Sequence, residues 1–434
     1  MKKLPERPPD IREKMGLVNI IDQGDPEIMK LVNEYNSRYL YYDELKYRIS
    51  DPNKRTGIWM FMKLLRMMKY EAVPYSCLNL QYSTTPEISR SLHIFDQYLS
   101  GNIRTHERNI KLDQSYILSS LMEEAIASSI IEGAVTTRKA AKDMLRKGKK
   151  PSNKSEQMVM NNYRAMQHIM EYKDEPLTPE FILDVHRIVT ESTLEDAAIG
   201  SFRKNDDIVV ADPINGTIHH IPPSYTKVSG MVDEICRFAN RDDEGPEGFI
   251  HPIVKGIMLH FLIGYIHPFE DGNGRCARSI FYWYVLSRGY WLFEYMPISR
   301  IILKSRKDYS LAYLHTEYDG MDLTYFILYN IRCIEKARTD LLSYIERKQA
   351  EQSPAKEIIR NIPDINRRQA EILREMMEKK DDFFTIREIM ETWGVVYETA
   401  RTDLLTLADL GYIRKEKKGR EFVFRFDEEC GLRG

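Results

Sequence analysis

The sequence predicts a mainly α protein with one small β-hairpin and a separate C-terminal domain. Between about residues 96 and 350, apolar residues recur at spacings of three and four, as in SYILSSLMEEAIASSII, which is the period of helices with one buried face. The stretch DDIVVADPINGTIHHIPP instead has two short apolar runs around Asn-Gly, a pair that favours hairpin turns. A charged stretch, ERKQAEQSPAKE, then precedes a final segment that ends in two strand-like runs.

The length of 434 residues exceeds what one hydrophobic core normally organises, so two or three domains are expected. We place an N-terminal extension at 1–95, a helical domain at 96–350 and a C-terminal domain at 351–434. Charged residues make up 29% and hydrophobic residues 43%, values typical of a soluble globular protein. The formal net charge of −2 does not favour nucleic acid or membrane as a partner for the whole chain.

The cysteines and the chain's apolar runs bear on where the protein works. The 5 cysteines lack paired spacing, which argues against a disulfide framework or a zinc site and is typical of a reducing cytosol. The first residues have no signal-like apolar segment, and no apolar run is long enough to span a bilayer. We therefore expect a cytoplasmic protein with no membrane contact.

The first long helix is expected over 113–132 and ends in SSIIEG, with Gly133 placed to terminate it. Ser128 and Glu132 are four residues apart and share one face. A carboxylate in the last turn opposes the helix dipole, so it gains from a nearby cation. By itself the pattern S-x-x-x-E-G is weak, and it is more often a surface feature than a site.

The hairpin is expected to pair the apolar runs 208–210 and 217–221 around the Asn-Gly turn. Such a hairpin could simply cover the core. His219 and His220 lie on it and are interpreted as surface or structural residues, and His260 in the following helix as a packed core residue.

The stretch HPFEDGNGRCAR places many charged groups between two apolar, helix-like segments. A proline follows His267 and disfavours helical backbone there, so the preceding helix should end at this histidine. Gly272 and Gly274 permit positive φ on either side of Asn273, and a helix can restart near Arg275. The N–H groups of such a turn form an anion-binding nest at the start of a helix.

Arg275 and Arg278 share one face of that first turn. Two cations at the positive end of a helix dipole are unfavourable alone, so an anion of several charges, such as a polyphosphate, is expected. A P-loop would require Gly-Lys-Ser/Thr after a strand, and an EF-hand would require more oxygen ligands than Asp271 and Asn273. The alternative is a solvated loop whose charged residues only cap helices, but the density of groups favours a site.

HPFEDGNGRCAR resembles the signature of the Fic family of nucleotidyl transferases, His-x-Phe-x-Asp/Glu-Gly-Asn-Gly-Arg-x-x-Arg, at every specified position. GSFRKNDDIVV, HHIPPSY and HPIVKGIMLH are also similar to that family, and the resemblance covers about 96–340. It implies a Fic-type helical core whose hairpin is a flap that registers a target segment by strand pairing.

The resemblance also implies roles for individual residues. His267 would be the general base that takes a proton from a target hydroxyl as it attacks the α-phosphate of ATP. Phe269 would anchor the loop in the core, and Asp271 would hold Mg²⁺. The expected ATP-binding residues are Gly272, Asn273, Gly274, Arg275, Arg278 and, beside the adenine, Tyr309. The family often pairs that tyrosine with a second one, and Ser310 stands there in this chain.

Ser128, Glu132 and Gly133 resemble the family's inhibitory-helix motif. The resemblance implies that Glu132 pairs with Arg278 and takes the place of the γ-phosphate. In some relatives this glutamate also serves the reverse reaction, removal of AMP, so the direction stays open.

The C-terminal stretch TIREIMETWGVVYETARTDLLTLADLGYIRKEKKGREFVFRF resembles a winged helix-turn-helix. Thr385 is expected to begin its first helix and Gly394 to end it. The second helix would face the DNA major groove, and RKEKKGR would be the wing. The expected DNA contacts are Tyr397, Glu398, Thr399, Arg401 and Thr402. Opposite charges nearly cancel in this domain, so a protein-interaction module is equally open.

The sequence thus predicts a protein adenylyltransferase that uses ATP and Mg²⁺ to modify a Ser, Thr or Tyr hydroxyl of a protein, which could be the chain itself, and that Glu132 restrains. The alternatives are a nucleotide-sensing, DNA-binding transcriptional regulator, and an enzyme that transfers or removes a different phosphate-containing group. A homodimer is left open, as is the target.

Overall fold

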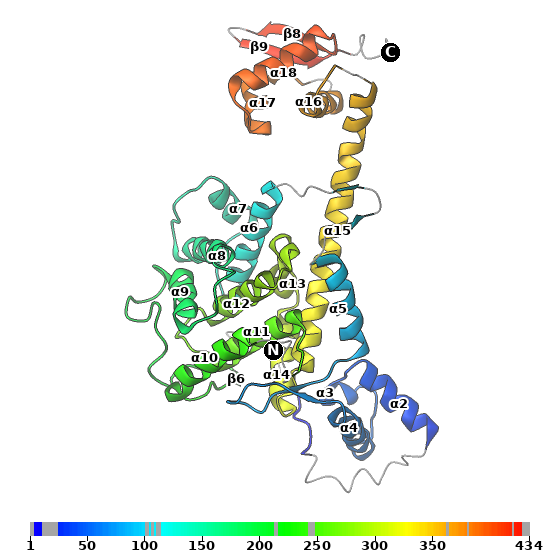
Figure 1. Ribbon diagram of the computed structural model, residues 1–434, viewed down its shortest axis with the longest axis vertical. Coiled ribbons are helices and arrows are strands. Elements are labelled where there is room, and N and C mark those ends of the chain that lie inside the picture. Colours follow the sequence, from blue (N-terminus) through cyan, green and yellow to red (C-terminus); the bar gives the residue numbers. More distant parts are fainter. Residues whose placement is uncertain are drawn as a thin grey trace. The chain divides into compact units, whose positions relative to one another are not determined.

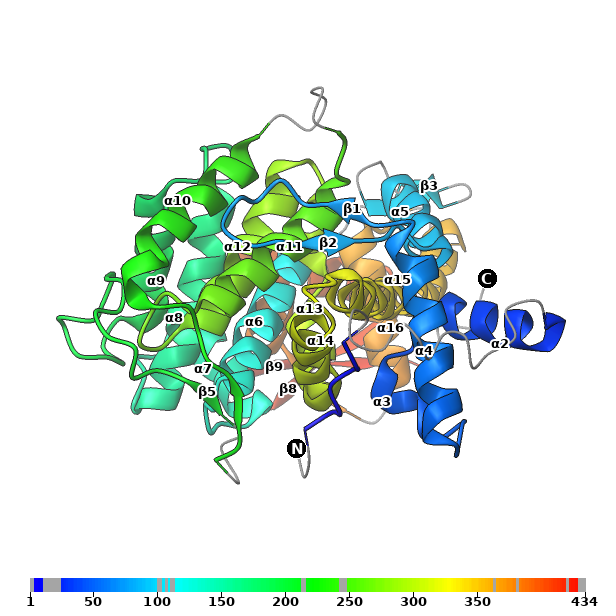
Figure 2. The same ribbon diagram turned by 90° about the horizontal axis from the view of Figure 1, so that it is seen from below.

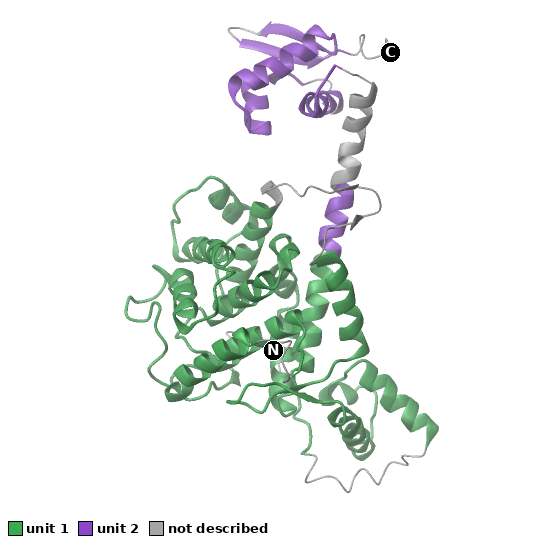
Figure 3. Cartoon of the chain, in the orientation of Figure 1, with its two compact units in different colours: residues 1–338 green, residues 339–434 purple. Residues whose placement is uncertain are grey.

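The computed structural model describes residues 4–10, 25–99, 104–105, 108–109, 114–211, 216–241, 248–361, 364–379, 382–418 and 421–427. The protein is mainly helical, as predicted (Figure 1). It divides into two compact units, Met1–Arg338 and Thr339–Gly434 (Figure 3). None of the described helices combines the length and the hydropathy that a bilayer span requires.

Unit 1 is built from helices and short antiparallel strand pairs. The helices are α2 (Pro26–Ser37), α3 (Tyr42–Leu45), α4 (Pro52–Met67), α5 (Pro86–Leu99), α6 (Gln114–Ile131), α7 (Arg138–Arg146), α8 (Lys154–Glu171), α9 (Pro179–Thr190), α10 (Tyr225–Asn240), α11 (Pro252–Ile266), α12 (Asn273–Ser287), the 3₁₀ helix η2 (Trp291–Tyr295), α13 (Ile298–Lys304), α14 (Arg306–Tyr318) and the start of α15 (Thr324–Asn361). The strand pairs are β1 (Glu71–Ala72) with β2 (Gln81–Tyr82), β3 (Arg104–Thr105) with β4 (Arg108–Asn109), and β5 (Val210–Ala211) with β6 (Ile218–His220).

Helices α11 and α12 form the centre of unit 1, where they pack against each other (Figures 1 and 2). Both are buried on nearly every face, as expected for helices without a continuous polar stripe. The loop between them, 267–272, carries the charged motif. Helices α6, α8 and α9 pack around this pair, so they hold the loop from the side.

Helix α6 ends as the sequence predicts. Gly133 has a φ of +94°, and its N–H donates to Ile130 O at 3.1 Å, while Ala134 N–H donates to Ser129 O at 3.0 Å. These two bonds form the turn that glycine favours after a helix. Glu132 is therefore held in the capping turn of α6.

The predicted hairpin is present as β5 and β6, which pair through Val210 with His220 and Ala211 with Ile218. Its strands are shorter than the predicted apolar runs. Most of the turn, including Asn215, lies outside the described residues, and Gly216 has a φ of +68°.

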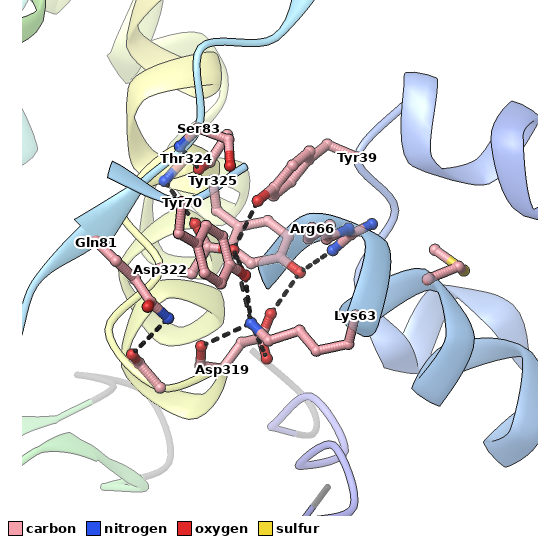
Figure 4. A network of polar contacts seen from close by, with 12 residues as sticks. Tyr39, Lys63, Arg66, Tyr70, Gln81, Ser83, Asp319, Asp322, Thr324 and Tyr325 are labelled. Carbon is pink, nitrogen blue, oxygen red and sulfur yellow. Dashed lines mark hydrogen bonds and ion pairs between the residues drawn. The ribbon is translucent and has the colours of Figure 1, made fainter. Parts of the chain in front are cut away.

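Residues 1–95, predicted as an extension, contribute α2 to α4 and most of α5 to unit 1. A buried polar network joins them to the turn between α14 and α15 (Figure 4). Lys63 Nζ lies 2.8 Å from Asp319 Oδ1 and 3.7 Å from Asp322 Oδ2. The hydroxyls of Tyr39 and Tyr70 each donate to Asp322 Oδ2 at 2.7 Å. The network places two carboxylates beside a cation in a region closed to solvent.

Unit 2 contains the remainder of α15, then α16 (Arg367–Glu378), β7 (Phe384–Thr385), α17 (Ile386–Trp393), α18 (Tyr397–Asp409), β8 (Ile413–Lys418) and β9 (Glu421–Phe426). Its antiparallel strands are in the order β7-β9-β8. Thr385 is the N-cap of α17 and accepts from Glu388 N at 3.1 Å, and Gly394 ends this helix with a φ of +64°, both as predicted. The apolar faces of the three helices and the sheet enclose a separate core.

The charged stretch ERKQAEQSPAKE was expected to separate the domains, but it lies inside α15. The chain divides at 338/339, twelve residues before the predicted boundary at 350/351. Glu, Lys, Gln and Ala are strong helix formers, so a polar composition does not by itself end a helix.

Candidate active site

The loop between α11 and α12 has left-handed backbone at both ends. His267 ends α11 with φ +51° and ψ +59°, and its N–H donates to Ile263 O at 3.0 Å. Gly272 has φ +85° and precedes the first residue of α12, Asn273. The prediction of positive φ holds for Gly272 but is wrong for Gly274, because α12 already begins at Asn273 and Gly274 is helical.

Asn273 uses its side chain to close this loop. Its Oδ1 accepts from Phe269 N at 2.9 Å and its Nδ2 donates to Phe269 O at 2.8 Å. Phe269 is fully buried, as the anchor role requires. Because the Asn273 amide is committed inside the loop, only its backbone N–H is placed to contribute to an anion nest.

His267 is oriented by contacts to its ring and to the backbone on either side of Pro268's peptide bond. Its Nδ1 lies 3.1 Å from Gly264 O, and since a carbonyl only accepts, Nδ1 carries the proton and Nε2 keeps its lone pair. Burial lowers the pKa of His267, so the ring is neutral at neutral pH. Arg203 Nε donates to His267 O at 3.0 Å, and Arg203 N donates to Pro268 O at 2.9 Å. The geometry leaves one basic ring nitrogen available at this position.

Arg278 lies in the second turn of α12 and is paired with the capping turn of α6. Its Nη2 lies 2.9 Å from Glu132 Oε1, and its Nε donates to Ser128 Oγ at 2.9 Å. The Arg278 side chain is only 3% exposed, whereas that of Glu132 is 25% exposed. The structure therefore brings Ser128, Glu132 and Arg278 together, although Glu132 and Arg278 are 146 positions apart in the sequence.

The absence of a side chain at Gly274 allows the carboxylate of Glu132 to reach the start of α12. A Cβ at Gly274 would lie 2.1 Å from Glu132 Oε1 and 2.8 Å from its Cδ. The carboxylate thus rests on the first turn of the helix, where free N–H groups and the helix dipole favour negative charge. An anionic group from the protein itself occupies the predicted anion site.

Arg275 starts from the same face of α12 as Arg278 but has different partners. Its guanidinium is fully buried, with Nη1 donating to Val189 O at 2.5 Å and Nη2 lying 3.4 Å from Asp271 Oδ2. Burial lowers the pKa of Arg275. Asp271, 42% exposed, is thus the acid whose carboxylate is open to solvent beside a buried cation. These contacts favour a role for Arg275 in holding Asp271, and its predicted phosphate contact stays a prediction.

Tyr309 lies on α14, and its hydroxyl is 2.8 Å from His260 Nε2. His260 is buried, which together with Arg278 lowers its pKa to about 3, so it is a packed neutral histidine. Burial raises the pKa of Tyr309, with Arg278 acting in the opposite direction. The ring is half-buried near the site, and its contact with adenine stays a prediction.

His186 on α9 was not singled out from the sequence. Its ring stacks on Phe269 with centroids 3.7 Å apart, and its Nε2 lies 3.0 Å from Asp271 O. Burial lowers the pKa of His186 to about 4. Arg203 was also assigned no role. Each acts on a loop that is far away in the sequence, and only the resemblance around GSFRKNDDIVV pointed toward Arg203.

A metal site made only of protein side chains is absent from the described part of the chain, since no cluster of three His, Cys, Asp or Glu residues is present there. Mg²⁺ commonly uses one or two carboxylates together with phosphate oxygens. The single exposed carboxylate of Asp271 beside the anion site fits that pattern.

The predicted DNA-contacting residues lie at the start of α18. Tyr397, Glu398, Arg401 and Thr402 are exposed, and Thr399 is partly exposed. Arg401 Nη1 donates to Glu398 Oε1 at 2.6 Å, so its charge is partly balanced in this structure.

A helix start that receives a carboxylate, a neutral histidine nearby and an exposed carboxylate are features typical of sites that bind phosphate groups. Residues 176–285, which include α9 to α11 and most of α12, match the model of the Fic/DOC family. This segment of the chain is therefore similar to Fic/DOC domains.

Curated relatives carry the same name in several animals. The chain is 29% identical over 164 residues to the protein adenylyltransferase Fic of Nematostella vectensis, covering 38% of this chain and 34% of that protein. It is 27% identical over 165 residues to the protein adenylyltransferase Fic of Aedes aegypti, covering 38% of this chain and 29% of that one. The match thus spans about a third of the length of these relatives.

Solved structures share the fold. A Fic family protein from Desulfovibrio desulfuricans G20 aligns with a TM-score of 0.54 at 17% identity, covering 80% of this chain and 98% of that chain. Fic-1 of C. elegans, residues 134–508, aligns with a TM-score of 0.50 at 17% identity, covering 78% and 92%.

Proposed function

We propose that this chain is a protein adenylyltransferase that transfers AMP from ATP to a hydroxyl side chain of a protein. The observation that carries the proposal is the carboxylate of Glu132 on the first turn of α12, paired with Arg278 at 2.9 Å. A carboxylate in this position supports a site that accepts negative charge. A terminal phosphate would make the same contacts with Arg278 and with the N–H groups of the helix start.

His267 supplies the base for the transfer. The oxygen of the target hydroxyl attacks the α-phosphorus, the bond from that phosphorus to the pyrophosphate oxygen breaks, and the hydroxyl proton passes to Nε2 of His267. The ring is suited to this step because Gly264 O holds the proton of Nδ1 and because burial lowers the pKa of His267. Arg278 would stabilise the charge that develops on the leaving pyrophosphate.

Mg²⁺ would be held by the carboxylate of Asp271, which Arg275 contacts and His186 supports through the peptide oxygen. When bound, the ion would neutralise negative charge on the phosphates. Replacing Asp271 by Asn would keep the loop's size and remove the hard anionic ligand.

Glu132 would restrain the enzyme in its own chain, because it competes with phosphate for Arg278. Helix α6 is held in place by hydrogen bonds to α13 and α14. Buried Glu124 accepts from Ser299 N at 2.9 Å, and Arg306 Nη2 donates to Ile130 O at 2.6 Å and also to Ile131 O. A cation at the last carbonyls of a helix satisfies groups that lack helical partners. These contacts support a restraint that acts within one chain.

The direct test uses purified protein with MgATP. A Glu132→Gly variant is expected to gain the mass of one AMP group on itself, and Glu132→Gly with His267→Ala is expected to gain none. Transfer that persists without His267 contradicts its role as base. A folded Glu132→Gly variant that binds no ATP contradicts the proposed function itself, and one that binds ATP without any transfer favours the nucleotide sensor.

Unit 2 supports a second candidate, a DNA-binding regulator that senses nucleotide through the first unit. The element order α16, β7, α17, α18, β8, β9 supports a winged helix, in which α18 would enter the major groove and the β8–β9 turn would be the wing. Transfer or removal of another phosphate-containing group is a third candidate. Product analysis by mass spectrometry distinguishes it, because the added or lost mass identifies the group.

A further inference from the structure

The last turn of α9 holds the motif loop at three points. His186 stacks on Phe269 with nearly parallel rings, 6° apart. Val189 O accepts from Arg275 Nη1 at 2.5 Å. A Cβ on Gly272 would lie 2.9 Å from Thr190 Cγ2, so the loop backbone reaches this turn closely. Contacts with α9 therefore help to fix the conformation of the loop.

The hydrogen bonds of His186 fix its ring in one protonation state and one orientation. The N–H of Gly200 donates to Nδ1 at 3.1 Å, so Nδ1 has a lone pair and no proton. The proton of the neutral ring is then on Nε2, which lies 3.0 Å from Asp271 O and donates to it. The ring is wholly buried, so water does not compete for either bond.

The peptide that His186 holds is the one that precedes Gly272 and the start of α12. Asp271 Oδ1 accepts from Gly272 N at 2.5 Å, so the carboxylate and its own peptide are oriented together. A shift of this peptide would move both the exposed carboxylate and the first N–H groups of α12. Groups that orient a ligand in this way commonly change metal affinity by roughly 10- to 100-fold when they are removed.

We propose that His186 is a positioning residue that, through the hydrogen bond from Nε2 to Asp271 O, sets the carboxylate of Asp271 for a divalent cation bound with a nucleotide. The inference deepens the proposed function and rests on it. His186 does not touch the nucleotide or the reacting hydroxyl.

The test separates the two ring nitrogens with a matched pair of variants in the Glu132→Gly protein. Gln at position 186 places an amide N–H near the position of Nε2, whereas Asn places its oxygen near the position of Nδ1. His186→Gln therefore keeps a donor for Asp271 O, and His186→Asn keeps an acceptor for Gly200 N. Both lose the stacking on Phe269, so any general loosening of the loop affects the two alike.

The readout is binding of Mn²⁺, a paramagnetic substitute for Mg²⁺, measured by electron paramagnetic resonance with α,β-methylene-ATP present. We expect the Gln variant to bind Mn²⁺ within about threefold of its parent and the Asn variant to bind it roughly 10- to 100-fold more weakly. Thermal unfolding of both variants provides the control for folding. Auto-modification should follow the same order.

Equal Mn²⁺ affinity in the two folded variants overturns the inference while leaving the proposed function intact. If the parent itself binds no Mn²⁺ with the nucleotide, the inference and the proposed metal site both fail. Should the Asn variant not fold, the Gln variant decides alone, and a loss of roughly tenfold or more in its Mn²⁺ affinity overturns the inference.

Discussion

Replacing Glu132 with Gly removes the carboxylate that rests on the start of α12. Arg278 Nη2 then loses its contact with Glu132 Oε1 at 2.9 Å. Its Nε and Nη2 keep their hydrogen bonds to Ser128. Because Arg278 is only 3% exposed, solvent cannot replace the lost partner, and the site gains affinity for another anion.

The size of the gain in MgATP affinity follows from the contact between Glu132 and Arg278, which a phosphate must displace in the unaltered chain. A hydrogen bond to a charged group contributes roughly 1.5–3 kcal/mol, and each ~1.4 kcal/mol changes an equilibrium tenfold. Removing Glu132 should therefore raise the affinity for MgATP by roughly 10- to 150-fold. Without nucleotide, the same variant should unfold at a lower temperature than the unaltered chain, and saturating MgATP should bring its unfolding temperature back up.

The assay compares three proteins by calorimetric titration with α,β-methylene-ATP and by their rate of auto-modification. Glu171→Gly is the matched control, because Glu171 is an exposed glutamate at the end of another helix, α8. It should behave like the unaltered chain. Equal affinities and equal rates in the unaltered chain and in a folded Glu132→Gly variant would refute the competition that we derive from the structure.

Three further predictions address His267, the end of α6 and unit 2. Burial lowers the pKa of His267, and a general base acts in its deprotonated form. Auto-modification by Glu132→Gly should therefore be constant near neutral pH and fall only in acid, below the usual histidine pKa of about 6.5. A fall centred above that pH would contradict the assignment of His267 as base. Arg306→Ala should free the end of α6, because it removes a hydrogen bond of ~0.5–1.5 kcal/mol. Auto-modification of the otherwise unaltered chain should then rise roughly 2- to 12-fold. The control Lys307→Ala changes an exposed residue and should leave the rate unchanged. No increase in Arg306→Ala, or a further increase when it is added to Glu132→Gly, would count against a role for Arg306 in holding Glu132 against α12. If unit 2 binds DNA, a mobility shift should weaken with salt and with Arg401→Ala, and insensitivity to both would favour a protein partner.

Local features of this chain were predictable from the sequence. The helix expected over 113–132 is α6, and Gly133 terminates it because only a residue without Cβ adopts that backbone at little cost. Thr385 and Gly394 bound α17 for equally local reasons. Caps and turns depend on neighbours within a few positions, so their signals are visible in a short stretch.

The contacts that build the site were not predictable from spacing. His186 lies 85 positions from Asp271, and Arg203 lies 64 positions from His267. No periodicity connects such pairs, because packing of α9, and of the segment between α9 and β5, against the loop from α11 to α12 brings them together. The pairing of Glu132 with Arg278 was expected only from the family resemblance. The prediction that Gly274 adopts positive φ was wrong. A glycine is needed there because the carboxylate of Glu132 approaches the helix closely.

The polar network around Lys63 has a practical consequence for anyone who wishes to study the helices around the candidate site in isolation. Asp319 and Asp322 are 5% and 0% exposed. Lys63, which balances their charge, and the two tyrosine hydroxyls that donate to Asp322 come from the first 95 residues. A chain trimmed to start at residue 96 would lose these partners together with the apolar side chains of α2 to α4, and would expose the surface that they bury. Expression of such a fragment should yield aggregated material, so the amino-terminal helices must be retained in any shortened form of the protein.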